Sequence, residues 1–284
     1  MIKSRAIVLH RFAYSDSSWI VKALTEECGI VSFIVKGGKR KESPFKGALD
    51  PLATSEVVFR QNPNAELQFI KEATILDWHK NLRDDLLNLA EAQVMTEIVL
   101  RYAPQGVPLP EEFALLERAI DEYCYTPAAQ QTTSQTATTA QHAALITAPQ
   151  NAPQTAPQNA PQNTPQNAPR SSIFARWLLD ICDLWGYHLE LSVCSRCEHL
   201  LEEAPADFHP ETGELICQHC LGVATARARK ETTDDLWNLL NAKELTNKQF
   251  VENALLAYLR HHIGFLKEIK SLQFLNQTRN LFMK

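Results

Sequence analysis

The chain has 284 residues, of which 45% are hydrophobic and 21% are charged, and its formal net charge is −5. This length allows two modest domains of ordinary globular composition. No run of eighteen apolar residues is present, which excludes a membrane-spanning helix. The N-terminal sequence lacks the apolar core and small-residue cleavage site of a signal peptide, so we expect a cytoplasmic protein.

The charge is distributed unevenly along the chain. Residues 1–60 hold ten Lys and Arg against six Asp and Glu, a net charge of +4. Residues 61–125 have a net charge of −7, and residues 171–284 have a net charge of −3. Such an asymmetry suggests an anionic partner that binds on one side only.

Residues 1–75 have the pattern of short β-strands. Five runs rich in Val, Ile and Phe are separated by turn signals such as Gly37-Gly38 and Asn62–Asn64. Five short strands predict a small closed barrel, and the OB-fold is the natural candidate because closure removes exposed edges. The expected strands are Ser4–His10, Trp19–Thr25, Ile30–Lys36, Ser55–Arg60 and Leu67–Ala73.

The loop after the third expected strand concentrates basic residues around Gly37 and Gly38. Glycines let the backbone approach a phosphate, basic side chains neutralise it, and Phe45 could stack on a base. The alternative is a solvated charged loop without a ligand. Trp19 and Phe33 are predicted to be core residues rather than stacking platforms. The candidate nucleic-acid contacts are Lys36, Lys39, Arg40, Lys41, Phe45 and Lys46.

From about Asn81 the apolar period changes to 3.6 residues, which predicts one long amphipathic helix that ends before Pro104. The adjacent acids Asp84-Asp85 and Glu111-Glu112 are interpreted as solvated helix faces, because neighbouring helical residues point about 100° apart. No catalytic constellation is recognisable, and neither a Walker A loop nor a dinucleotide-binding motif is present. The further expected helices are Glu111–Tyr123, Ile173–Trp185, Asp234–Leu240, Asn247–Gly264 and Ser271–Gln277.

A low-complexity segment rich in Ala, Gln, Thr, Asn and Pro occupies residues 126–170, and its second half repeats a four-residue unit. Recurrent proline blocks helix and sheet, so we expect a disordered, partly polyproline II insert. The predicted architecture is α+β. Its parts are an OB-fold domain (1–78), an α-helical domain (79–125 and 171–284), the disordered insert (126–170) and a zinc-ribbon insert (190–224).

Two C-x-x-C pairs, Cys194/Cys197 and Cys217/Cys220, are separated by nineteen residues. This spacing is typical of a structural zinc site, in which four thiolates complete a tetrahedral shell and leave no position open for catalysis. Two disulfides or a redox pair are the alternatives, but disulfides need an oxidising compartment. His199, His209 and His219 lie near these pairs and could replace one cysteine as ligand.

These elements together resemble the bacterial recombination mediator RecO. The resemblance lies in R-A-I-V-L-H-R-F-A-Y-S-D-S-S-W-I-V (Arg5–Val21), G-I-V-S-F-I-V-K-G-G-K-R-K (Gly29–Lys41) and F-K-G-A-L-D-P-L (Phe45–Leu52). It continues through the helices after Asn81 and the two cysteine pairs. It covers essentially the whole chain except the low-complexity insert.

The resemblance implies an OB-fold followed by a helical domain with a zinc ribbon, and a non-enzymatic role in recombinational repair. Members of the family bind single- and double-stranded DNA, anneal complementary strands, interact with the single-strand-binding protein and with RecR, and help to load the RecA recombinase. It implies that the basic loop contacts DNA and that the four cysteines bind one zinc ion. Arg11, in the expected first turn, would add a phosphate contact. The expected location is the cytoplasm, at the nucleoid when active.

Two other classes of function compete with this interpretation. The chain could be a zinc-ribbon adaptor that binds only proteins, with the basic loop incidental. A nuclease is the third hypothesis, and it would need carboxylates gathered from separate segments to bind a divalent metal.

Overall fold

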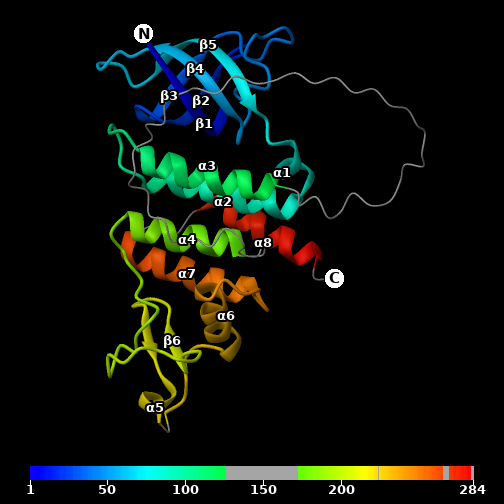
Figure 1. Cartoon of the computed structure of the whole chain (residues 1–284). Helices are drawn as coiled ribbons and strands as arrows, with labels where there is room; N and C mark the ends of the chain where they lie inside the picture. Colours follow the sequence, from blue (N-terminus) through cyan, green and yellow to red (C-terminus); the bar gives the residue numbers. More distant parts are fainter. Residues whose placement is uncertain (126–171, 223, 265–268, 283–284) are drawn as a thin grey trace, which may run out of the picture. The chain divides into compact units, whose positions relative to one another are not determined.

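The structure is a computed structural model that describes residues 1–125, 172–222, 224–264 and 269–282 (Figure 1). These residues belong to one compact unit. The insert predicted at residues 126–170 lies outside the described residues. Among the described helices, none combines the length and apolar character needed to cross a membrane.

Five N-terminal strands form a closed barrel in the order β1-β2-β3-β5-β4, which confirms the predicted OB-fold (Figure 1). All neighbouring strands are antiparallel except β3 and β5, which pair in parallel at Phe33↔Gln68 and Ile34↔Phe69. The strands are β1 (Ile2–Ala13), β2 (Trp19–Thr25), β3 (Gly29–Val35), β4 (Thr54–Arg60) and β5 (Gln68–Asp77).

Alternation along the strands divides the barrel into an interior and an outer face. Phe33 is fully buried in the interior and meets Phe59 edge-on, with ring centroids 5.0 Å apart. The prediction that Phe33 is a core residue is therefore confirmed. On the outer face, Ile7 and Leu9 of β1 belong to the same apolar core as the helices. One side of the barrel is thus covered by helices.

The junction between barrel and helices depends on Gly29. Its φ is +66°, and a Cβ at this position would lie 2.0 Å from the backbone oxygen of Val107. Only glycine combines this conformation with so close an approach of a neighbouring chain segment.

Helix α2 packs against strand β1 and against the helices α3 and α8 (Figure 1). Helix α4 packs against α3 and α7. Helices α3 and α4, on either side of the low-complexity insert in sequence, are linked by an ion pair of 3.0 Å between Arg118 and Asp180. The helices are α1 (Lys80–Asp84), α2 (Leu86–Tyr102), α3 (Pro110–Cys124), α4 (Ile173–Leu184), α5 (Gln218–Leu221), α6 (Lys230–Leu240), α7 (Lys248–Ile263) and α8 (Lys270–Phe282).

Two expectations about acidic helix residues are wrong. The single helix expected from Asn81 is interrupted at Asp85, whose backbone is extended (φ −111°, ψ 110°). Its carboxylate accepts hydrogen bonds from the backbone N–H groups of Leu87 and Asn88, so Asp85 caps α2 instead of continuing α1. Glu112 is buried and accepts a hydrogen bond of 3.2 Å from the Trp185 indole, so it does not lie on a solvated face.

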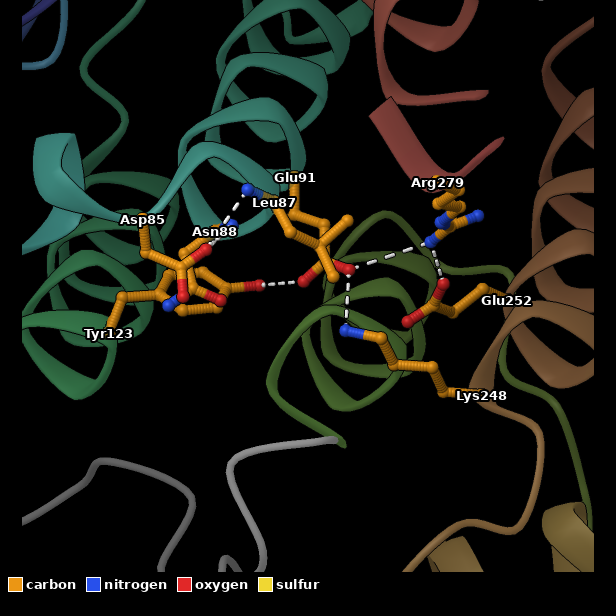
Figure 2. Close-up of polar contacts among 8 residues, drawn as sticks. All are labelled: Asp85, Leu87, Asn88, Glu91, Tyr123, Lys248, Glu252 and Arg279. Atoms are coloured by element: carbon orange, nitrogen blue, oxygen red, sulfur yellow. Dashed lines mark hydrogen bonds and ion pairs between the residues drawn. The ribbon is translucent and has the colours of Figure 1, made fainter. Parts of the chain in front are cut away.

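A buried network of charged residues joins α2, α3, α7 and α8 (Figure 2). Glu91 accepts hydrogen bonds of 2.8 Å from both Lys248 Nζ and Tyr123 OH. Arg279 lies between Glu91, at 3.5 Å, and Glu252, to which it donates a hydrogen bond. Burial and the nearby Glu91 charge raise the pKa of Glu252 to about 8, while Arg279 and Lys248 act in the opposite direction.

Candidate nucleic-acid interface and metal centre

A cleft of about 290 Å³ opens at one end of the barrel, beside the loop that connects β3 and β4. Six of the seven predicted DNA-contacting residues line it, and only Lys36 does not. Val35, Leu49 and Trp19 supply apolar wall. The complete lining is Arg11, Trp19, Val35, Gly38, Lys39, Arg40, Lys41, Phe45, Lys46, Leu49 and Asp50.

The basic loop is held in shape by a succession of backbone turns. Gly38 N–H donates to Val35 O at 3.3 Å, Arg40 N–H to Gly37 O at 3.0 Å, and Ser43 N–H to Arg40 O at 3.0 Å. Phe45 is partly buried against the barrel core, which anchors the far side of the loop. The backbone of the loop is therefore ordered before any ligand binds. Because of this, less conformational entropy is lost when its basic side chains bind a ligand.

Trp19 forms the aromatic floor of this cleft. It packs partly buried against the barrel core, as predicted, but Arg11 Cζ also lies 4.8 Å and Lys39 Nζ 5.2 Å from its ring centroid. Gly38 allows this arrangement, because a Cβ there would lie 2.6 Å from Trp19 Cδ1. Sequence reasoning missed this role, since Arg11 meets the ring only after β1 and β2 have paired, and Lys39 only after β2 and β3 have paired.

Arg11 lies elsewhere than predicted, and it already has a carboxylate partner. It belongs to β1 and not to the turn that follows. Its guanidinium forms an ion pair of 2.5 Å with Asp50, and the other oxygen of Asp50 accepts a hydrogen bond of 3.1 Å from Trp78 Nε1. Asp50 and Trp78 were not predicted at this site. Arg11 therefore braces the cleft wall, and its charge is balanced locally.

The other basic residues of the loop carry no such balance. Among the described residues, no ion pair with a carboxylate within 4.0 Å involves Lys36, Lys39, Arg40, Lys41 or Lys46. Lys39 Nζ donates to the Ser15 carbonyl oxygen, a neutral acceptor. Arg40, Lys41 and Lys46 are exposed. The cleft therefore presents positive charge that an anionic ligand can neutralise.

Lys36 lies apart from the cleft. Its ammonium stands 5.1 Å from the ring centroid of Phe69 on β5. The structure thus brings the predicted residues to two neighbouring places on the barrel rather than one.

The four predicted metal ligands come together in a small ribbon formed by β6 (Asp207–His209), β7 (Glu214–Ile216) and α5. Their Sγ atoms all lie within 4.8 Å of one another, and Cys197 and Cys217 are 3.9 Å apart at Sγ. None of the seven cysteines forms a disulfide, and the described cluster contains no histidine. This arrangement could hold one metal ion.

The two halves of the cysteine cluster are fixed by backbone contacts. Cys217 N–H donates to Cys194 Sγ at 3.4 Å, and the Arg196 guanidinium donates to Cys220 O at 2.9 Å. Burial acts to raise the pKa of the Cys194 thiol, but the backbone N–H groups of Cys217, Arg196 and Cys197 outweigh it and lower that pKa to about 6. Thiolates are the metal-binding form of cysteine, so these contacts favour metal binding.

Comparison with known proteins agrees with this architecture. The family described as Recombination protein O N terminal matches residues 1–79. A protein of Pelobacter propionicus named DNA repair protein RecO is 26% identical over 98% of this chain and 97% of its own length. These matches bear out the resemblance to the RecO family.

Two further RecO proteins match mainly the N-terminal part. Those of Salinibacter ruber and Geobacter metallireducens are 31% and 34% identical, each over 42% of this chain. In these relatives the match spans about half of their length, 46% and 48% respectively. The family match at residues 1–79 contains the whole barrel and all seven predicted DNA-contacting residues, whereas the four cysteines lie beyond it.

Proposed function

We propose that this chain is a non-enzymatic, DNA-binding mediator of recombinational repair. It would bind single- and double-stranded DNA and hold complementary strands close enough to anneal. The observation that carries the proposal is the cleft at the end of the barrel. It is lined by the half-buried Trp19 and by basic loop residues that have no carboxylate partner among the described residues: Lys39, Arg40, Lys41 and Lys46. Relatives named DNA repair protein RecO support the same function.

The proposed mechanism is electrostatic. Each Lys or Arg that neutralises a phosphate releases condensed counterions, which supplies affinity without sequence preference. Aromatic rings add stacking with unpaired bases. A protein that holds flexible strands by their backbones leaves the base edges free to pair with a second strand.

The partners belong to the same proposal and rest on the family resemblance. They are the single-strand-binding protein, RecR and, functionally, the RecA recombinase, which the chain would help to load onto coated DNA. The place of action would be the cytoplasm, at the nucleoid.

For the cysteine cluster we propose one structural zinc ion. A tetrahedral shell with Zn–S bonds of about 2.3 Å places sulfur atoms about 3.8 Å apart. The separation of 3.9 Å between Cys197 and Cys217 fits that value. Four thiolates satisfy the coordination of zinc, so the ion would stabilise the ribbon without taking part in a reaction.

The test is fluorescence anisotropy with labelled single-stranded DNA across a salt series, with strand annealing followed on the same stock. Replacing Lys39, Arg40 and Lys41 with Ala removes three charges from the loop. The slope of log affinity against log salt should fall by about 2, since each single-strand phosphate contact contributes about 0.7. Annealing should slow in parallel.

The matched control removes three exposed charges elsewhere, by replacing Lys3, Lys71 and Lys80 with Ala, and gives the same net charge. It should leave the slope close to that of the unaltered protein. If both triple variants behave alike, or if the unaltered protein binds no DNA at low salt, the DNA-binding proposal fails. The chain would then belong to the class of zinc-ribbon adaptors that bind only proteins.

A further inference from the structure

Among the described residues that line the cleft, Asp50 alone is acidic. Its Oδ1 atom lies 2.5 Å from Nη1 of Arg11, and the Arg11 and Asp50 side chains are 27% and 28% exposed. A ligand that enters the cleft can therefore reach this ion pair. The protein thus places an anion of its own in a cleft whose other charged residues attract anions.

The pairing between Arg11 and Asp50 uses only one nitrogen of the guanidinium. Both described hydrogen bonds of Arg11 come from Nη1, one to Asp50 Oδ1 and one to the Leu49 carbonyl oxygen at 3.4 Å. A guanidinium binds a carboxylate or a phosphate most strongly through two parallel N–H bonds, which this arrangement does not provide. Partly exposed ion pairs with a single contact are weak. Arg11 can therefore exchange Asp50 for a phosphate that it binds with two nitrogens.

Asp50 keeps other contacts when Arg11 leaves it. Its Oδ2 atom accepts a hydrogen bond of 3.1 Å from Trp78 Nε1. Its backbone is fixed on both sides, because its N–H donates to Gly47 O at 3.2 Å and its carbonyl oxygen accepts from Ala53 N–H at 3.0 Å. The carboxylate would therefore stay in place, hydrogen-bonded, beside the cleft.

Arg83 supplies a second cation close to Asp50. Its Cζ atom lies 4.4 Å from the ring centroid of Trp78, and its Nη2 atom donates to Pro51 O at 2.6 Å. Burial lowers the pKa of Arg83, and the charge of Asp50 acts in the opposite direction. Arg11 and Arg83 thus share one carboxylate. The exchange at Arg11 avoids the large cost of leaving a charge unpaired, because Arg83 remains near Asp50.

We infer that Asp50 is an internal competitor of the DNA phosphate: it neutralises Arg11 in the free protein and gives Arg11 up to a phosphate of the bound strand, while Trp78 and Arg83 retain the displaced carboxylate. This inference rests on the proposed function and assigns to Asp50 the control of how tightly the cleft holds DNA. A phosphate reaches Arg11 only by breaking an existing pair, so the cleft binds DNA less tightly than its cations alone would. Such moderate retention suits a protein that passes strands on to a partner.

The first test measures anisotropy with a labelled oligothymidylate across a salt series, for the full chain. Asp50→Asn keeps the side-chain shape and can still accept from Trp78. It should tighten binding about 2- to 5-fold, the equivalent of one partly exposed ion pair that no longer has to be broken. Arg11→Gln should lower the salt slope by about 0.7, because Arg11 contacts one phosphate in the complex. In the Arg11→Gln protein, Asp50→Asn should bring no tightening.

The matched control is Glu42→Gln, which removes one negative charge from the same loop. Glu42 is exposed and takes part in no ion pair among the described residues. It should bind DNA like the unaltered protein. If Glu42→Gln tightens binding as much as Asp50→Asn does, or if the gain from Asp50→Asn persists without Arg11, Asp50 acts by general repulsion and the inference is overturned.

A second measurement uses the unaltered protein and does not depend on any variant folding. The indole N–H resonance of Trp78, assigned by its absence in Trp78→Phe, reports on Asp50 by NMR of isotope-labelled protein. Trp78 does not line the cleft, so bound DNA should move this resonance only through Asp50. A resonance that stays in place at saturating DNA would overturn the inference. If the Lys39, Arg40 and Lys41 variant also keeps the full salt slope, the DNA-binding proposal fails as well; if its slope falls, only the role of Asp50 is refuted.

Discussion

The buried Glu252 makes a prediction about how stability depends on pH. Its side chain is fully buried on α7 and faces Glu91 of α2 and Arg279 of α8. Lys248, one turn earlier on α7, and Tyr123 both donate to Glu91, with Tyr123 on the far side of it (Figure 2). Burial is the largest cause that raises its pKa, from 4.5 to about 8. Between pH 4.5 and about pH 8, the Glu252 carboxyl therefore keeps its proton in the folded state, whereas it has lost that proton in the unfolded state.

The sign and the magnitude follow from this difference. The contribution to stability is fully present below about pH 4.5 and is lost progressively as pH rises toward 8. Over the interval from pH 5 to pH 8, the loss from one group with these two pKa values is about 3 kcal/mol. Glu252→Gln keeps the shape and can still accept from Arg279, but it carries no titrating proton. The difference in unfolding free energy between the two proteins should therefore shift in favour of the variant by about 3 kcal/mol over this interval.

Urea unfolding followed by circular dichroism at several pH values measures this difference directly. A suitable control is Glu72→Gln, since that side chain is 63% exposed and contacts only Lys71 among the described ion pairs. Its curve should run parallel to that of the unaltered protein. If the Glu252→Gln curve is also parallel, within about 1 kcal/mol, the carboxyl is ionised throughout and the reasoning is refuted.

Two further predictions concern the ribbon and the helices. Cys217→Ser should lower the bound zinc, measured by elemental analysis, from about one equivalent to none, and should lower the unfolding temperature of the C-terminal half while the barrel keeps its own transition. A variant with unchanged zinc content and unchanged melting would remove the structural role of the metal. Asp85→Ala removes the cap that accepts from Leu87 and Asn88 and should cost about 1 kcal/mol in thermal or urea unfolding. Asp84→Ala, next to it and also exposed, should cost less, and equal losses would show that Asp85 acts by charge alone.

Much of the barrel and the composition of the candidate sites could be predicted from the sequence. Alternating apolar residues and turn signals placed all five strands, because a half-buried strand imposes a period of two. The paired cysteines identified their own cluster, since ligand spacing is a local property. The basic loop was visible as a local excess of charge.

What the sequence could not predict depends on register between distant strands. The placement of Arg11 and Lys39 against Trp19, and of Lys36 against Phe69, follows only after β1, β2, β3 and β5 have paired. The buried acids show the same limit. Glu91 shares α2 with the partly exposed Glu97, and Glu252 is the single acid of α7, so nothing in the local pattern marks either one as interior. The partners of Glu91 come from three other helices, and the partner of Glu252 comes from α8.

The buried network also determines which part of this chain can fold first during synthesis. The barrel uses residues 2–77 alone, so all its strands are available early. Glu91 is synthesised soon afterwards, but the two cations that neutralise it, Lys248 and Arg279, belong to α7 and α8. Until Arg279 has left the ribosome, a closed helical core would enclose unbalanced carboxylates, which is costly. The nascent chain can therefore present a folded barrel, with its basic cleft, while the helical half still awaits its last helix.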